Sequence, residues 1–241
     1  MSKQFDCKNR DKYLEMPIEE KRKLYKCSND YVTIEQIDII KDQLKTIALD
    51  SKISESHKIN TLSIEEAELF GDKISLWKGD ITKLEVDSIV NAANERLLGG
   101  QGVDGAIHRG AGKLLLEECR SLHGCKTGHA KLTGGYNLPS KYVIHTVGPI
   151  GERPNMLKSC YKSCLELMKA NNLLTIAFPC VSTGVFGYPN ESAALVAIET
   201  VLEFLRSDYG KSVDRIIFTL FLDKDVKIYE SIMKAYFDAI N

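Results

Sequence analysis

The chain has 241 residues, 44% of them hydrophobic and 27% charged, with a formal net charge of −1. These values are ordinary for a soluble globular protein, and the length allows one large domain with an extension. The near-zero charge gives no electrostatic basis for binding nucleic acid or an anionic membrane. No apolar stretch approaches the ~20 residues that span a bilayer, and the N-terminus lacks the apolar core of a secretory signal. We therefore expect an intracellular protein, cytoplasmic and/or nuclear.

Seven cysteines are scattered along the chain without a C-x-x-C pair. One cluster invites a metal interpretation, namely Cys119, His123, Cys125 and His129. Its spacing is not that of a known zinc module, and it straddles the end of a helix and a loop. We therefore expect reduced thiols and no bound metal.

The first 72 residues differ in pattern from the rest and predict a helical N-terminal leader (1–72). Residues 17–25 read as a helix, because proline suits a first turn. Thr33 is predicted to cap an amphipathic helix. That helix would present Ile34, Ile37, Leu44 and Ile47 on one face. Residues 50–60 are polar and read as a loose connection.

From residue 73 onward, apolar strand patterns alternate with helical ones. Strands are predicted over 74–77, 86–92, 129–133, 142–147, 175–181 and 215–222. Helices are predicted over 104–122, 156–170, 191–209 and 226–240. Gly210 is expected to stop the third of these helices as a C-terminal glycine. This alternation predicts an α/β domain of three layers, α/β/α.

Four unusual segments follow predicted strands: 79–81, 92–104, 181–187 and, less clearly, Phe221. In open α/β sheets, ligands bind at the carboxyl ends of the strands. The convergence of these segments on strand ends is a stronger argument for a site than any single motif.

The segment 90–112 is the richest in chemistry. A strand leads into a loop dense in glycine, which suits close approach of a phosphate to free backbone N–H groups. Asn94 could hold a sugar diol or a water, or it could only bond its own loop. Asp104 and His108 stand four apart, so a helix would place them on one face, where a carboxylate can orient an imidazole and a water. An N-cap aspartate near a surface histidine is the alternative for that pair.

Two further segments remain open between a site and a structural role. Asp80 could accept a hydrogen bond from an exocyclic amine such as that of adenine, or it could cap the turn that follows. The loop 182–188 could hold a second phosphate through its N–H groups, with Phe186 against a ribose, or it could be an ordinary connection. His145 alternates within a strand and reads as structural.

The residues from 73 to 237 resemble a macrodomain of the MacroD-type class. The matching segments are GDITKLEVDSIVNAAN (79–94), GVDGAIHR (102–109), TGHAKLTGGYNLP (127–139), YVIHTVGP (142–149) and FPCVSTGVFGYPNE (178–191). Residues 19–37 are similar to the helical leader of animal MacroD proteins. The resemblance implies a macrodomain over 73–241, with a mixed central sheet of about six strands.

The resemblance also implies an activity. The chain would bind ADP-ribose, remove mono-ADP-ribose from acidic side chains of modified proteins, and deacetylate O-acetyl-ADP-ribose, as a monomer and without a cofactor. The alternative is a reader that binds ADP-ribose without turnover. A phosphoesterase or nucleic-acid role is disfavoured by the neutral charge and the lack of carboxylate clusters.

Site residues follow from the matched motifs. Asp80 would contact the adenine amine, with Ile81 and Phe221 near the base. Asn94 and Asp104 would orient the distal ribose and a water, His108 would support Asp104, and a substrate phosphate oxygen would serve as the base. The predicted binding residues are Gly79, Asp80, Ile81, Ala92, Ala93, Asn94, Gly99, Gly100, Gln101, Gly102, Val103, Asp104, Val181, Ser182, Thr183, Gly184, Val185, Phe186, Gly187 and Phe221.

The chain departs from the family pattern at two positions. Gln101 stands where a third consecutive glycine of four is usual, and Gly110 where alanine is usual. Gln101 could crowd the loop or add a hydrogen-bond donor. It therefore bears on the turnover rate more than on binding.

Overall fold

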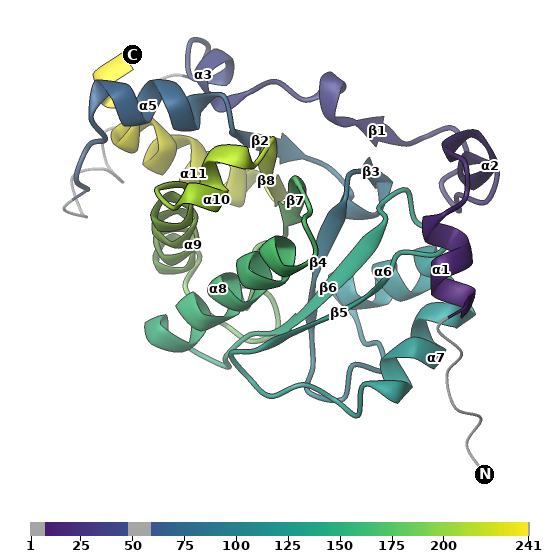
Figure 1. The fold of residues 1–241 in the computed structure, drawn as a ribbon. Helices are drawn as coiled ribbons and strands as arrows, with labels where there is room; N and C mark the ends of the chain where they lie inside the picture. The colour runs from purple at the N-terminus through teal and green to yellow at the C-terminus, as the bar shows by residue number, and fades with distance from the viewer. Residues whose placement is uncertain (1–7, 48–58, 241) are drawn as a thin grey trace.

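The computed structural model describes residues 8–47 and 59–240. Its centre is a six-stranded sheet in the order β2-β8-β7-β4-β6-β5 (Figure 1). These strands are β2 Ile74–Lys78, β4 Ser88–Ala93, β5 Ala130–Gly134, β6 Tyr142–Val147, β7 Thr175–Phe178 and β8 Arg215–Leu220. Only β5 runs antiparallel to its neighbour, and the other pairs are parallel. The predicted mixed sheet of about six strands is confirmed.

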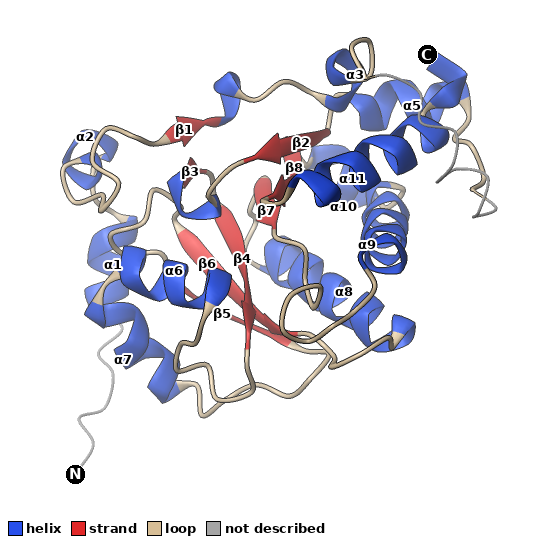
Figure 2. Ribbon diagram, turned by 180° about the vertical axis from the view of Figure 1, so that it is seen from behind, coloured by secondary structure: helices blue, strands red, loops and turns tan. Residues whose placement is uncertain are grey.

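Helices cover both faces of this sheet, so the predicted three layers are confirmed (Figure 2). The α-helices are α1 Lys8–Leu14, α2 Ile18–Arg22, α3 Ile40–Gln43, α5 Ile64–Gly71, α6 Gly102–Ala111, α7 Lys113–Ser121, α8 Pro154–Ala170, α9 Asn190–Leu205, α10 Asp208–Ser212 and α11 Asp223–Tyr236. Short 3-10 helices are η1 Ile34–Gln36, η2 Ile81–Lys83 and η3 Asp238–Ile240.

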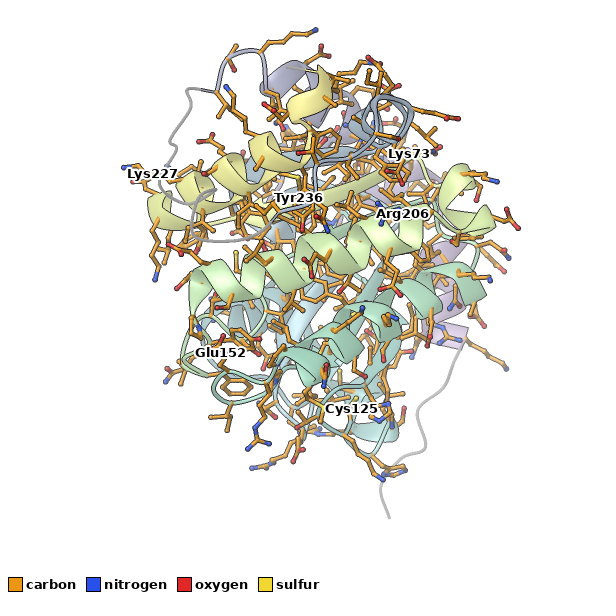
Figure 3. All side chains as sticks on the ribbon, turned by 90° about the vertical axis from the view of Figure 1, so that its left-hand side faces the viewer. Lys73, Cys125, Glu152, Arg206, Lys227 and Tyr236 are labelled. Atoms are coloured by element: carbon orange, nitrogen blue, oxygen red, sulfur yellow. The ribbon has the colours of Figure 1, made fainter. Side chains whose placement is uncertain are left out.

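Two apolar clusters form the core, one on each face of the sheet. Helices α8, α9 and α11 supply the larger cluster, and α6 and α7 supply the other. Figure 3 looks onto the larger side, where α8, α9 and α11 lie beside one another. On that side the Tyr236 hydroxyl of α11 donates to Glu199 Oε1 of α9 at 3.1 Å. None of the described helices is both long and apolar enough to cross a membrane.

Several predicted helices are wrong in their bounds. The helix predicted over 17–25 is α2, which ends at Arg22, and the one predicted over 226–240 is α11, which ends at Tyr236 and is followed by η3. The helix predicted over 104–122 is two helices, because Gly112 between them has φ +85°, a left-handed conformation that breaks the α-helix and favours glycine. Gly210 does not stop a helix at residue 209: α9 ends at Leu205, and Gly210 lies inside α10. The amphipathic helix predicted after Thr33 is instead η1 followed by α3, since Ile37 has an extended conformation.

The leader packs against the rest of the chain and shares its core. Strand β1 (Val32–Thr33) pairs in parallel with β3 (Leu84–Glu85). Ile40 and Phe70 are buried in the same cluster as α8 and α9. The predicted loose connection at 50–60 lies mostly outside the described residues. The domain division after residue 72 stays a prediction, but the two parts have one continuous interior.

Lys21 of α2 gives the leader a pH-sensitive anchor. Its buried ammonium donates to Ser140 O at 3.0 Å and to Pro139 O at 3.4 Å, and burial lowers its pKa to about 8. Between this value and the unfolded value of 10.5, the unfolded chain binds the extra proton, so stability contributed here rises with pH. We expect the unfolding free energy of wild type, relative to Lys21→Met, to increase between pH 8 and 10 by about 1–3 kcal/mol in urea titrations. A difference independent of pH would contradict this assignment.

Candidate functional site

The strand order brings the four predicted segments together at one edge of the sheet. Strands β2, β8, β7 and β4 are consecutive neighbours and all parallel, so their carboxyl ends lie side by side. With about 4.8 Å between strands, the loops after β2 and β4 are separated by about 14 Å. This span suits an extended ligand of dinucleotide size. The loops after β2 and β8 are linked directly, because Gly79 N donates to Leu220 O at 3.1 Å, next to Phe221.

Asp80 performs the structural role that the sequence left open. Its Oδ1 accepts from Thr82 N at 3.0 Å and from Thr82 Oγ1 at 2.7 Å, which caps η2. Both bonds use one oxygen, so Oδ2 is the atom available to a ligand amine. The two alternatives are therefore compatible. Phe221, at the end of β8, is 73% exposed, while Ile81 is buried in the core and can offer a ligand only its backbone.

The loop after β4 is held in shape by Asn94. Its Oδ1 accepts from Arg96 N at 3.0 Å, and its Nδ2 donates to Gly99 O at 3.1 Å. Both are bonds within the loop, as in the structural alternative. They also fix the amide beside Gly100 and Asp104: a Cβ on Gly100 would lie 3.5 Å from Asn94 Nδ2 and 3.0 Å from Asp104 Oδ2. Asn94 and Asp104 therefore both lie beside Gly100, and their shared role in catalysis stays a prediction.

The structure explains why a side chain is tolerated at Gln101. Gly99 and Gly102 have φ of +84° and +61°, which disfavour other residues, and a methyl group on Gly100 would press against Asp104 Oδ2 at 3.0 Å. Gln101 has an ordinary extended conformation, φ −100° and ψ 176°, and its side chain is exposed. Gln101 therefore does not strain the loop.

Substitutions at Gly100 and Gln101 should differ in their effect on ligand binding. We expect Gly100→Ala to lower ligand affinity or turnover at least tenfold, because the methyl group displaces the Asp104 carboxylate or the Asn94 amide. Gln101→Gly is the matched control and should bind ADP-ribose within about threefold of wild type, since it removes only an exposed side chain. Calorimetric titration with ADP-ribose measures both variants. Equal losses in the two would show that the backbone here tolerates neither change.

Asp104 is the buried acid of the site, 3% exposed in the first turn of α6. Its Oδ1 accepts from Asn91 Nδ2 at 2.7 Å and lies 3.5 Å from His108 Nε2, which has no hydrogen-bond partner among the described residues. Burial raises the pKa of Asp104, while the Asn91 bond and His108 oppose that shift. Burial lowers the pKa of His108. Burial therefore disfavours the charged form of both groups.

Sequence reasoning missed two residues behind this pair. Asn91 of β4 and His145 of β6 are fully buried cross-strand partners, and Asn91 Nδ2 lies 3.0 Å from His145 Nδ1. The available signal was a polar side chain in the middle of each apolar strand. The sequence predicts a structural role for His145, and the residue is indeed fully buried, but its contact with Asn91 could not be read from spacing.

The four residues for which the sequence offered a metal interpretation, Cys119, His123, Cys125 and His129, do not form one group of metal-ligating atoms among the described residues. Within residues 8–47 and 59–240, the group close enough to share a metal ion is His108, Cys119 and His145, with ligand atoms within 4.8 Å of one another. His123, Cys125 and His129 do not join it. The six described cysteines, which exclude Cys7, are free.

The loop after β7 lies between the loops after β8 and β4 in the row of strand ends. Ser182 has φ +68°, and its carbonyl accepts from Tyr188 N at 3.0 Å. Gly187 N donates to Gly184 O at 3.0 Å, so these residues form a compact turn. Val185 at the tip is 93% exposed, and Val181 is buried. The predicted phosphate contact of this loop stays a prediction.

Comparisons with known proteins agree with this geometry. The Macro domain family model matches residues 90–197. The ADP-ribose glycohydrolase MACROD1 of Rattus norvegicus is 45% identical over 98% of this chain and 91% of its own length. MACROD2 of Mus musculus is 49% identical over 95% of this chain, which spans only 48% of that relative's length. A Trypanosoma brucei macrodomain in complex with ADP-ribose is 39% identical, covering 92% of this chain and 94% of its own, with a TM-score of 0.70. The chain belongs to the Macro domain family.

Proposed function

We propose that this chain binds ADP-ribose along the carboxyl ends of β2, β8, β7 and β4 and hydrolyses mono-ADP-ribose from acidic side chains of modified proteins. Similarity to relatives named ADP-ribose glycohydrolases supports the activity, and the structures with ADP-ribose support the ligand. The observation that carries the catalytic part is the buried Asp104 carboxylate between His108 and the loop held by Asn94. A reader of ADP-ribose has no need of that acid.

The proposed chemistry uses the chain's own side chains for positioning. The scissile bond is an ester between the distal ribose and a carboxylate, which is more labile than an amide. Asn94 and Asp104 orient the ribose and a water, and the neutral His108 lies beside the Asp104 carboxylate. A substrate phosphate oxygen accepts the proton of the water. Holding the water and the ester together supplies much of the rate. The same arrangement would deacetylate O-acetyl-ADP-ribose.

The test is a protein mono-ADP-ribosylated on glutamate, incubated with the full chain. Release of free ADP-ribose, followed by chromatography, supports the hydrolase. O-acetyl-ADP-ribose, followed by loss of the acetyl group, tests the second activity. Binding of ADP-ribose by calorimetry without release from either substrate would leave the reader as the function. We also propose that the protein acts as an intracellular monomer, which size-exclusion chromatography with light scattering and cell fractionation would test.

A further inference from the structure

A continuous chain of buried polar groups runs from β5 to Asp104. Thr133 Oγ1 of β5 lies 2.8 Å from His145 Nε2, and His145 Nδ1 lies 3.0 Å from Asn91 Nδ2. The same Asn91 nitrogen donates to Asp104 Oδ1 at 2.7 Å. Thr133, His145 and Asn91 are all 0% exposed. Three strands and one helix therefore meet in one hydrogen-bonded line that ends on the acid of the site.

The direction of each bond in this line follows from its acidic end. An ionised carboxylate only accepts, so the Asn91 amide must turn its NH₂ group toward Asp104. The second hydrogen of that group points at His145 Nδ1, which must then accept. A neutral imidazole that accepts at Nδ1 carries its proton on Nε2, and this proton is donated to Thr133 Oγ1. Each member has one role consistent with the others.

We propose that His145 is a positioning residue for Asp104: its Nδ1 accepts one hydrogen of the Asn91 amide and thereby aims the other at the Asp104 carboxylate. The proposal rests on the proposed function for its kinetic consequences, but the hydrogen-bond arrangement can be tested without turnover. Neither residue touches the ribose in this scheme. His145 acts on the acid through Asn91.

Burial of the network makes the orientation of the Asn91 amide matter, because no solvent can replace a lost hydrogen bond. The other atom of the amide, Asn91 Oδ1, is buried with no hydrogen-bond partner among the described residues. Turning the amide over would aim this oxygen at the Asp104 carboxylate, which accepts and does not donate. The acceptor at His145 Nδ1 disfavours this rotation, since it too would then face an oxygen.

Among the groups around Asp104, Asn91 makes the largest contribution to stabilising its ionised form. His108 of α6, Cys119 of α7 and His145 of β6 face this region. Burial lowers the pKa of His145 to about 3 and raises that of the Cys119 thiol to about 12, so both are neutral at pH 7. His108 is neutral for the same reason. Of the two groups that counter the effect of burial on the Asp104 pKa, the hydrogen bond from Asn91 is the larger and His108 the smaller.

The first experiment observes the wild-type protein, and a variant serves only to assign its signals. In wild type labelled with ¹⁵N-histidine, the long-range spectrum of the imidazole reports which nitrogen carries the proton, and the spectrum of His145→Phe identifies the His145 signals. We expect a bare Nδ1 and a protonated Nε2 at pH 7. A protonated Nδ1 would overturn the proposal, whatever the activity of the protein.

The second experiment uses two amide substitutions at His145 that distinguish the contribution of Nδ1 from that of Nε2. The Oδ1 of His145→Asn can take the place of Nδ1 and accept from Asn91, whereas the amide of His145→Gln reaches the place of Nε2 and faces Thr133. The pKa of Asp104, followed by ¹³C NMR of its carboxyl group, should rise by about one unit in His145→Gln and stay near wild type in His145→Asn. The acid limb of the kcat/KM profile should move by the same amount.

Thr146→Val is the matched control, because Thr146 is a buried neighbour on the opposite face of β6 that donates to His129 O at 3.0 Å. It should lower the Tm without moving the pKa of Asp104. A Tm loss in His145→Gln with an unchanged Asp104 pKa would reduce His145 to a structural residue and overturn the proposal. If no variant or wild type turns over substrate while the pKa values shift as expected, the proposed function fails and the positioning role stands.

Discussion

Replacing Asp104 with asparagine should abolish most of the hydrolase activity while leaving the fold as stable as wild type. The loss expected for removing a positioned acid or base is about 10²–10⁴-fold in kcat. The amide introduced by Asp104→Asn keeps an oxygen that can accept from Asn91, so the surrounding contacts survive. Release of ADP-ribose from a glutamate-modified protein measures the rate.

The stability expectation follows from the sign of the pKa shift. Burial raises the pKa of Asp104 in the folded protein above its unfolded value. The folded state then holds more protons between the two values, so the stability this residue contributes falls as pH rises through that range. At neutral pH the ionised acid is a cost, which Asp104→Asn removes. Its Tm at pH 7 should therefore be no lower than that of wild type.

Asp87→Asn is the control, because the pKa of Asp87 is shifted in the opposite direction from that of Asp104. Asp87 precedes β4, at the far end of that strand from the site, and accepts from Lys141 Nζ at 2.8 Å and from Leu174 N at 2.9 Å. Burial would raise its pKa, but these bonds prevail and lower it. Asp87→Asn should lose stability at pH 7 and keep its turnover at low temperature. A Tm loss in Asp104→Asn comparable to that of Asp87→Asn would contradict the cost assigned to the catalytic acid.

Replacing Glu118 with alanine should cost about 3 kcal/mol of unfolding free energy, the largest stability change that we expect from one side chain outside the apolar core. Glu118 is 2% exposed and lies at the meeting of the leader, α7 and β5. Its Oε2 accepts from Tyr136 Oη at 2.6 Å and from Gly134 N at 2.9 Å, and its Oε1 accepts from Arg10 Nη1 at 3.1 Å. Removal leaves two buried donors without this acceptor, each costing about 1–3 kcal/mol.

Urea unfolding measures this cost, and Glu117→Ala provides the matched control. Glu117 is the preceding residue of α7 and is exposed. Its replacement should change stability by at most about 0.5 kcal/mol. Similar losses in the two variants would indicate that helix α7 itself, and not the buried acceptor, is responsible. A loss confined to Glu118→Ala would show that the leader and the sheet are stabilised through one shared carboxylate.

The sequence predicted most elements because their signals are local. Apolar runs marked the strands, and glycine and proline marked several ends. The errors have local causes as well. Gly112 lies inside an apolar pattern that predicts one helix, and its left-handed conformation divides that pattern into α6 and α7. Gly210 is the residue type expected just after the end of a helix, but α9 already ends at Leu205.

The sequence by itself determined which chemistry was available: an amide at 94, a carboxylate at 104 and an imidazole at 108, beside glycines that leave room for a ligand. Tertiary structure alone decided which of these groups meet. Strand order placed β2, β8, β7 and β4 in one row, and the register of β4 with β6 set Asn91 opposite His145. Those residues are 54 positions apart, and their contact depends on strand pairing that no local pattern specifies.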